Sequence, residues 1–378
     1  MKKSSLLVCL LILVSVHFSI AQKNISRFTP EKLRLNYENL TRQSNLLFYE
    51  QRINRNPFIG LYEISTALPD TSVNAYVPLF QGMPVGKYSK GTQLTFSPLT
   101  KAEQKTFLKS KDFPLMRRNY KWDFWIQPNF TANFGNFLRP VESNTSVSLQ
   151  TQFQIIPGLT LNTGILFPIV SQIDQRPKII RPAATYLNYF YSSGNNYFST
   201  SLGFFNSDQY GLNVQYRKAD LSKQWSYGLE GSVTGFYFYN RSGLAYDDID
   251  QLMLLGDVAY RLKRLDLTMK LTAGQFLWSD RGARVDIIRQ FNNVEIGLYA
   301  TKTGNGSTLG FNFAIPIPPG KILQGKNTRL RTTEEFRWEY TYSRGYKIGE
   351  RYRIGYQLDQ KLRQYHQYYL DRQFQQLR

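Results

Sequence analysis

Few residues of this chain have the types and spacing that catalysis requires. Asp280 and Asp286 form the one carboxylate pair worth weighing, and they flank the basic segment Arg281–Arg284. Two carboxylates can hydrolyse a glycosidic bond when a cleft holds them at a defined separation. A structural interpretation is favoured instead: Asp280-Arg281-Gly282 forms a tight hairpin turn, and Asp286 pairs with Arg284 or Arg289.

Histidine and cysteine offer no alternative chemistry. One of the two histidines, His17, lies in the N-terminal leader, and His366 lies in a polar stretch near the C-terminus. This leaves no histidine cluster for a metal and makes a Ser-His-Asp enzyme improbable. Cys9 is the only cysteine and also lies in the leader, so the mature chain has no disulfide and no thiolate site. The sequence therefore predicts a protein that is not an enzyme and holds no cofactor or metal.

The N-terminus has the pattern of a secretory signal. Lys2-Lys3 precede the apolar stretch Leu6–Val16, and Ser19-Ile20-Ala21 supplies the small residues of a cleavage site. We expect residues 1–21 to be removed after Ala21. The alternative, acylation at Cys9, is disfavoured because Val8 is a poor residue before such a cysteine and because little apolar sequence would remain.

The charge of the chain indicates an anionic partner. The 378 residues include 47 Lys and Arg against 27 Asp and Glu, a formal net charge of +20. An exported protein rarely meets nucleic acid, so we expect lipopolysaccharide of the outer membrane or an acidic polysaccharide instead. The mean hydropathy of −0.39 and the lack of a second long apolar run exclude a polytopic helical membrane protein.

From about Trp122 to Pro318, apolar and polar residues alternate in short segments. The pattern is clear in Ser146–Ile155 and clearest in Leu309–Ile317, and turn residues such as Gly304-Asn305-Gly306 separate the segments. Gly282 and Gly306 are predicted turn formers. We expect about twelve such strands, several long enough to cross a bilayer when tilted.

A soluble β-sandwich would alternate in the same way, so other features must decide. The strand lengths, the leader and the crowding of Tyr and Phe at strand ends, as in Tyr186–Tyr191, favour an outer-membrane barrel. The predicted fold class is mainly β: a transmembrane antiparallel β-barrel of about 12–14 strands over residues 121–358, preceded by a small periplasmic α/β domain.

The flanking segments read differently. Residues 22–120 mix a helix start at Thr29-Pro30-Glu31, a strand at Leu46–Tyr49 and a helix from Asn56-Pro57, which indicates the small α/β domain. Its charged segment Lys101–Arg118 is expected to be a linker. Residues 359–378 are expected to form a polar C-terminal tail. The stretch Leu358–Leu377, rich in Gln and Tyr, is a candidate helix.

Four basic residues are candidate contacts for an acidic glycan inside such a barrel. Each lies on a predicted strand at or next to a polar-face position, where its charge would attract an acidic polymer. A role in structural ion pairs is the favoured alternative for each. These residues are Arg284, Arg289, Lys302 and Arg337.

One segment resembles a known family. Gly274–Asn293 is similar to a pattern of the YjbH family, outer-membrane proteins tied to exopolysaccharide and capsule export, and Ile296–Thr303 and Gly310–Pro318 continue the likeness. Tyr49–Pro57 also resembles a family segment. The chain is shorter than the family members and resembles their C-terminal half, so the family's two-barrel arrangement is not carried over. The family offers no catalytic residue to transfer.

Three hypotheses for function follow. The resemblance implies a non-enzymatic barrel that assists export or surface assembly of an exopolysaccharide, with periplasmic export proteins as further partners. The second hypothesis is a general porin or uptake channel. The third is a plugged structural or assembly component of an outer-membrane secretion machine.

Overall fold

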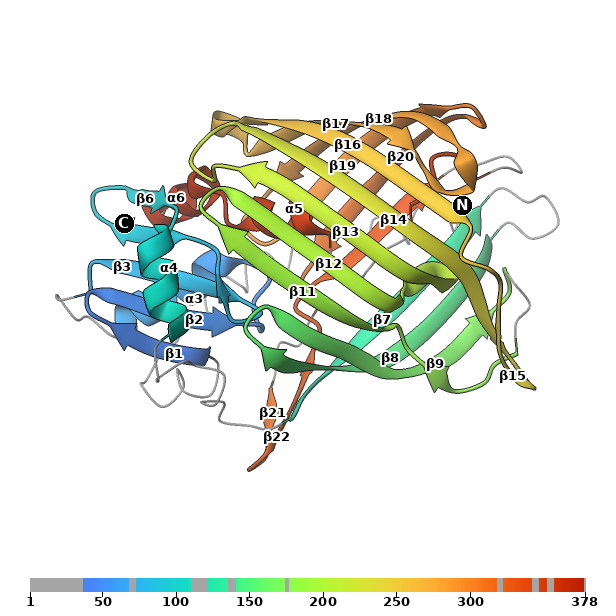
Figure 1. The fold of residues 1–378 in the computed structure, drawn as a ribbon, viewed down its shortest axis with the longest axis horizontal. Coiled ribbons are helices and arrows are strands. Elements are labelled where there is room, and N and C mark those ends of the chain that lie inside the picture. Colours follow the sequence, from blue (N-terminus) through green and yellow to red (C-terminus); the bar gives the residue numbers. More distant parts are fainter. Residues whose placement is uncertain are drawn as a thin grey trace, which may run out of the picture.

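The computed structural model describes residues 37–67, 73–109, 122–134, 141–173, 177–317, 322–341, 347–351 and 357–376. The predicted cleavage site at Ala21 and the predicted helix start at Thr29–Glu31 lie outside these ranges. The described chain forms an N-terminal α/β unit, a large curved sheet and two C-terminal helices (Figure 1). The prediction of a mainly β protein is confirmed. No helix in the described ranges is long and apolar enough to cross a bilayer.

The α/β unit is a mixed sheet with two helices. Its strand order is β1-β2-β3-β5-β6, with β4 beside β3, and β2 and β3 are parallel because α3 connects them. The predicted strand at 46–49 and the predicted helix from residue 57 are both present. The elements are β1 (Tyr37–Gln43), β2 (Leu46–Gln51), α3 (Pro57–Ala67), β3 (Ala75–Phe80), β4 (Met83–Pro84), β5 (Lys87–Lys90), β6 (Leu94–Ser97) and α4 (Lys101–Lys109).

The helix α4 corrects part of the linker prediction. Thr100 and Glu103 form a capping box: the Glu103 carboxylate accepts a hydrogen bond from the Thr100 backbone N–H at 2.8 Å, and the Thr100 hydroxyl accepts one from the Glu103 N–H at 3.2 Å. Phe107 stacks on Phe48 of β2 with 4.3 Å between ring centroids, in a small apolar core. Residues 101–109 therefore belong to the α/β unit, while the remainder of the expected linker, up to Arg118, lies outside the described residues.

The strands of the large sheet pair as a closed barrel. Nearly all neighbours are consecutive in the chain and antiparallel, joined by turns. Setting aside the short strands β10 (Arg181–Pro182), β15 (Gly243–Tyr246), β21 (Leu323–Gln324) and β22 (Thr328–Thr332), thirteen described strands remain. They are β7 (Trp122–Phe134), β8 (Val141–Ile156), β9 (Leu159–Ser171), β11 (Thr185–Ser193), β12 (Asn196–Phe204), β13 (Gln209–Ala219), β14 (Trp225–Asn240), β16 (Gln251–Leu262), β17 (Leu267–Gln275), β18 (Arg281–Gln290), β19 (Glu295–Thr303), β20 (Gly306–Ile315) and β23 (Phe336–Thr341).

The barrel closes at a parallel seam. Strands of an antiparallel meander alternate in direction, so an odd number brings the first and last strands together in parallel. Here β22 pairs in parallel with the start of β7, and β23, which pairs with β20, places Trp338 6.0 Å from Phe130 of β7. The seam is the one place where the wall departs from antiparallel pairing among the described strands.

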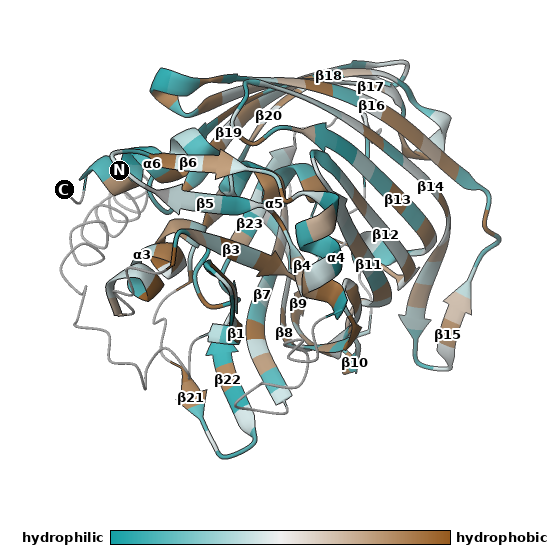
Figure 2. Cartoon of the chain, turned by 60° about the vertical axis from the view of Figure 1, so that its left-hand side comes forward, coloured by the Kyte–Doolittle hydropathy of each residue, from teal (hydrophilic) through white to brown (hydrophobic). Residues whose placement is uncertain are grey.

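The barrel wall is polar inside and apolar outside. Along β17, Thr268, Lys270 and Thr272 are buried, whereas Met269 and Leu271 are 45% and 51% exposed. The same alternation runs along β13 and β19, and Figure 2 shows it as bands of opposite hydropathy along the strands. A soluble sandwich buries its apolar face, so the order of the two faces is inverted here.

The two C-terminal helices, α5 (Leu358–Gln364) and α6 (Gln367–Gln376), lie inside the barrel and against the α/β unit, respectively (Figure 1). The backbone N–H groups of Leu94 and Phe96 on β6 donate to side chains of α6, Asp371 at 2.7 Å and Gln367 at 3.1 Å. This covers the edge of the sheet. Residues 359–376 are polar, and helical like the candidate helix predicted there. They form two helices with many buried side chains, so the expectation of a loose tail around His366 is wrong.

Two ends of the barrel are named below. The domain end carries the α/β unit and includes the turns 157–158, 194–195, 220–224, 263–266 and 291–294. The far end carries the opposite connections, among them 276–280 and 304–305.

Candidate functional site: the charged barrel interior

The described residues 347–351 and 357–376 are called the C-terminal segment below. This segment contacts the barrel at its far end. The backbone N–H of Gly349 donates to the Asp280 carboxylate at 2.8 Å, and the Leu277 N–H donates to the carbonyl of Glu350 at 3.1 Å. The indole N–H of Trp278 donates to the Glu350 carboxylate at 2.7 Å. Residues 349–350 are thereby fixed to the connection between β17 and β18.

The same segment contacts the wall midway along the barrel. Arg351 pairs with Glu230 of β14 and donates to Gln357 at 2.8 Å. The Lys270 ammonium of β17 lies 2.7 Å from the Asp359 carboxylate of α5. Both Lys270 and Asp359 are less than one-tenth exposed, so an isolated charge of either kind would be costly here.

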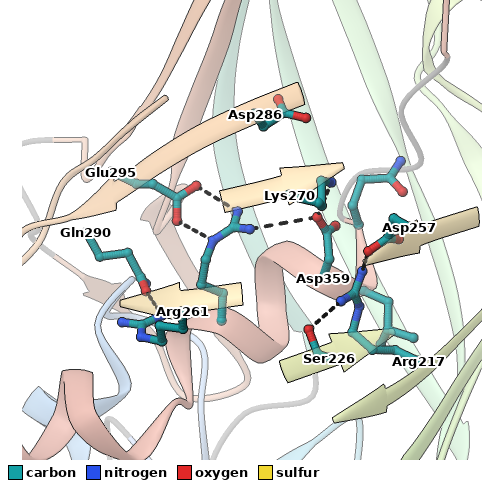
Figure 3. A network of polar contacts seen from close by, with 12 residues as sticks. Arg217, Ser226, Asp257, Arg261, Lys270, Asp286, Gln290, Glu295 and Asp359 are labelled. Atoms are coloured by element: carbon teal, nitrogen blue, oxygen red, sulfur yellow. Dashed lines mark hydrogen bonds and ion pairs between the residues drawn. The ribbon is translucent and has the colours of Figure 1, made fainter. Parts of the chain in front are cut away.

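Glu295 of β19 joins three parts of the molecule. Its carboxylate accepts hydrogen bonds from Arg363 of α5 at 3.0 and 3.1 Å and from Arg337 of β23 at 2.7 Å, and it lies 3.7 Å from the guanidinium of Arg55. Arg55 comes from the α/β unit and also pairs with Glu335 at 2.7 Å. The Glu295 carboxylate is fully buried, and Figure 3 shows it facing the interior. This cluster links the α/β unit, the barrel wall and α5.

At the domain end, side chains of α6 contact the turns of the barrel wall. Arg261 of β16 pairs with Asp266 at 3.0 Å, and Arg372 of α6 reaches the same aspartate at 2.9 Å. Arg261 also donates to Gln290 at 2.6 Å (Figure 3). The Tyr369 hydroxyl donates to the Asn292 carbonyl at 2.9 Å. Apolar side chains of α5, α6 and the α/β unit share one core with Leu221 of the barrel rim.

A second ionic cluster lies at the seam. Asp123 of β7 accepts from Arg329 at 2.8 Å and from Arg331 at 3.2 Å, both on β22. Arg329 also donates to Glu38 of the α/β unit at 2.8 Å, and Arg52 lies 3.0 Å from Glu38 and 3.3 Å from Asp123. Bidentate guanidinium contacts of this kind fix geometry as well as charge. The cluster holds the α/β unit against the seam.

Two buried carboxylates in this region, Asp359 of α5 and Glu335 beside it, are ionised at neutral pH. Burial alone would raise the pKa of Asp359, but the nearby Lys270 and Arg363 hold it well below its usual range. Burial acts in the same direction on Glu335, yet Arg337 and Arg55 lower its pKa to about 2. Both carboxylates therefore stabilise, at pH 7, the arrangement in which α5 lies inside the barrel. We call this the closed arrangement.

Two of the four predicted glycan contacts face the interior and are paired. Arg284 of β18 donates to Asp286 at 2.8 Å and to Glu339 of β23 at 3.0 Å, and its guanidinium lies 3.7 Å from the Tyr299 ring centroid. Arg337 is held by Glu295 and Glu335 as described above. For these two residues the geometry is that of the ion-pair alternative.

The other two predicted contacts, Arg289 and Lys302, do not face the interior, which corrects the prediction. Both are exposed on the outer face, where Arg289 follows Val285 and Ile287 along β18 and Lys302 follows Ile296 and Leu298 along β19. The reason is the two-residue period of a strand, which gives every second side chain the same face. The apolar residues at every second position before Arg289 and Lys302 identify the face of the strand as the outer one.

The predicted turn residues have mixed outcomes. Gly306 is the first residue of β20, follows the turn Gly304-Asn305 and has a φ of 142°, which favours glycine. Gly282 instead lies within β18, opposite Gly274, so its assignment to a turn is wrong. A Cβ at position 282 would lie 2.2 Å from the Lys302 carbonyl oxygen, so glycine is required there by close backbone approach.

The two weighed carboxylates each have structural partners. Asp280 accepts hydrogen bonds from the backbone N–H groups of Asn305 at 3.1 Å and Gly349 at 2.8 Å. Asp286 receives the Arg284 guanidinium. In the described part of the chain, no group of three His, Cys, Asp or Glu side chains is arranged to hold a metal ion.

Sequence reasoning missed the residues that hold the interior together. Those on strands lie on the polar faces, which the alternation of residues predicts. Their partners are far away in the sequence and could not be predicted from it. Asp123 and Arg329 are 206 residues apart, and Glu295 and Arg363 are 68 apart. The missed set is Glu38, Arg52, Arg55, Asp123, Glu230, Lys270, Glu295, Arg329, Arg331, Glu335, Arg351, Asp359 and Arg363.

Comparison with known proteins gives one family. No curated protein matches the chain. A family model, YjbH, described as "Exopolysaccharide biosynthesis protein YbjH", matches residues 179–333. This range runs from just before β10 to just after β22 and includes Gly274–Asn293, so the resemblance drawn from that segment is confirmed. Over the greater part of its barrel wall, this chain is similar to the YjbH family of exopolysaccharide biosynthesis proteins.

Proposed function

We propose that this protein is a non-enzymatic outer-membrane β-barrel that assists export or surface assembly of an exopolysaccharide. The family match over residues 179–333 is the observation that carries the polysaccharide assignment. The inverted wall supports the membrane location, because an outward apolar face is stable in lipid and unfavourable in water.

The proposed orientation has the domain end in the periplasm of a Gram-negative bacterium. The five turns named for this end have two to five residues, whereas the far end also carries the longer connections 172–184 and 241–250. Membrane barrels of this class have their short turns on the periplasmic side. The α/β unit then faces the periplasm, where export proteins are its proposed partners. Outward Lys302, near the far end, is suited to lipopolysaccharide, and the proposed cargo is an acidic exopolysaccharide.

Because the C-terminal segment occupies the interior, a barrel with a plugged lumen is favoured over a general porin. The C-terminal segment contacts the wall at the far end, midway and at the domain end, through Gly349, Asp359 and Arg363 among others. An open pore would require this segment to leave. A plugged structural or assembly component of a secretion machine is therefore the second candidate function.

The first experiment compares a deletion strain with the same strain carrying the intact gene. Surface polysaccharide is extracted and quantified, the membranes are fractionated on the same cells, and uptake of a small uncharged sugar is measured. We expect the protein in the outer-membrane fraction, less surface polysaccharide in the deletion strain, and unchanged sugar uptake.

Each other result points elsewhere. Normal polysaccharide with reduced sugar uptake would favour a porin and contradict the proposal. Normal polysaccharide and uptake, together with stoichiometric copurification of envelope proteins, would favour the assembly component. Absence from the outer-membrane fraction would overturn the location itself.

A further inference from the structure

A row of aromatic side chains crosses the outer wall from β11 to β16 near the domain end. Trp225 and Tyr227 of β14 and Tyr189 of β11 are each 41% exposed or more. Neighbouring strands place further rings beside them: Phe198 and Tyr216 lie 4.9 Å apart, and Trp225 and Tyr260 lie 4.8 Å apart. Aromatic rings at such a level mark the boundary between hydrocarbon and headgroups in membrane barrels.

Helix α4 lies directly beside this boundary. The amide of Gln104 donates to the carbonyl of Ser192 at 2.5 Å, and the hydroxyl of Ser192 donates to the carbonyl of Pro84. Ser192 follows Tyr191 at the end of β11, on the barrel rim. The α/β unit and α4 are therefore attached to the wall just beyond the aromatic row (Figure 1).

The face of α4 turned away from the protein is basic. Lys101, Lys105 and Lys109 are all exposed and follow one another at a spacing of four residues, which puts them on one side of the helix. Leu108 is exposed beside them. We call Lys101, Lys105 and Lys109 the lysine stripe.

The charge of the stripe is not balanced by described residues. The one acidic residue of α4, Glu103, lies on another side of the helix and pairs with Lys87 at 2.7 Å. None of the three stripe lysines forms an ion pair with a residue in the described ranges. Outward Lys218 adds a charge two strands from the end of β11, roughly 10 Å across the wall.

We propose that the lysine stripe binds the anionic headgroups of phospholipids in the leaflet on the domain side. This inference rests on the proposed location of the barrel in a membrane. A row of ammonium groups at headgroup level, with an apolar leucine next to it, fits a phosphate-bearing surface. The bound lipid holds the α/β unit close to the membrane plane.

The test uses the purified full-length protein and a triple variant, K101Q/K105Q/K109Q. Native mass spectrometry measures retention of phosphatidylglycerol and of phosphatidylcholine at several salt concentrations. We expect the wild type to prefer phosphatidylglycerol, the triple variant to bind it on the order of tenfold more weakly, and rising salt to reduce the difference. The control K178Q/R241Q/K326Q removes three exposed charges that belong to neither the stripe nor the proposed lipopolysaccharide contact, and it should retain the preference.

The outcomes separate this inference from the proposed function. Incorporation of both proteins into liposomes with equal lipid preference would overturn the lipid site and leave the barrel proposal intact. Failure of the wild type to enter liposomes would overturn both. Binding of soluble polygalacturonate that disappears in the triple variant would assign the stripe to an acidic polysaccharide and overturn the lipid assignment.

Discussion

At the scale of single residues, Glu295 is a carboxylate that joins three parts of the molecule. It is fully buried and receives Arg363, Arg337 and Arg55 from three parts of the chain. In E295Q the guanidinium groups remain buried without their counter-charge, which is expected to cost roughly 3–5 kcal/mol of the closed arrangement. We expect trypsin to cleave within residues 357–376 faster in E295Q than in the wild type. Mass spectrometry of the released peptides measures this cleavage.

The matched control for E295Q is D286N. Asp286 is also buried on an inner wall, but its ion pair is with Arg284 of the same strand and does not involve the C-terminal helices. Cleavage near α5 and α6 should stay close to wild type in this variant. Equal protection of E295Q and wild type would contradict the role assigned to Glu295.

His366 gives the closed arrangement a dependence on pH. Burial, together with the nearby Arg261, lowers its pKa to about 3. Its Nε2–H donates to the Lys223 carbonyl at 2.8 Å, and its Nδ1 accepts from the Tyr368 N–H, so the neutral ring is the one that fits. A depressed folded pKa means that this stability is present above about pH 6.5 and is lost as the pH falls toward 3.

The predicted loss from His366 is roughly 2 kcal/mol at pH 5 relative to pH 7.5. Hydrogen exchange of α5 and α6, measured at both pH values, should show weaker protection at pH 5 in the wild type. The variant H366Q keeps a donor toward Lys223 but does not titrate, so its protection should change less. A similar pH response in both proteins would reject the assignment.

At the scale of elements, α5 is held to β17 by one buried pair of opposite charges, Lys270 and Asp359. Either K270E or D359K places like charges together inside the barrel and is expected to drive α5 away from the wall. We expect single-channel conductance in planar bilayers to rise in both single variants. The double variant K270E/D359K restores an opposite pair and should return conductance toward the wild-type value.

This swap separates charge pairing from general damage. If the double variant conducts as much as the single variants, the pair does not control closure. A conductance rise limited to one single variant would indicate that other contacts of that residue dominate.

At the scale of the whole molecule, the outward apolar face of the wall predicts that charged substitutions on the outer surface destabilise the protein. Leu298 is 61% exposed in the middle of β19. In a water-soluble protein, L298R would be nearly neutral, whereas on a lipid-facing wall an arginine near the midplane costs about 2–4 kcal/mol. We expect a smaller folded fraction of L298R in liposomes, measured by the heat-dependent gel shift of the barrel.

The control for L298R is a change at the end of the same face. K302R keeps the charge of an outward residue near the far end, where polar headgroups accept it. Its folded fraction should equal that of the wild type. Unimpaired folding of L298R would argue against a lipid-facing wall.

Part of this architecture could be predicted from the sequence because it depends on local patterns. Alternation with period two identified the mainly β fold and most strands of the wall, and it contained enough information to place Arg289 and Lys302 outside. Capping and turn residues located α3 and the turn before Gly306. The segment Gly274–Asn293 was sufficient to find the family.

Only the tertiary structure shows that the C-terminal segment is buried against the polar interior of the barrel. Composition suggested a loose tail after residue 358, because Gln, Arg and Tyr resemble solvated surface when read in order along the chain. These side chains are buried because the barrel interior is polar and supplies partners such as Glu295 and Lys270, which lie dozens of residues earlier. Pairings over such separations leave no periodic trace in sequence, so only the fold shows that α5 lies inside the barrel and that α6 packs against the α/β unit.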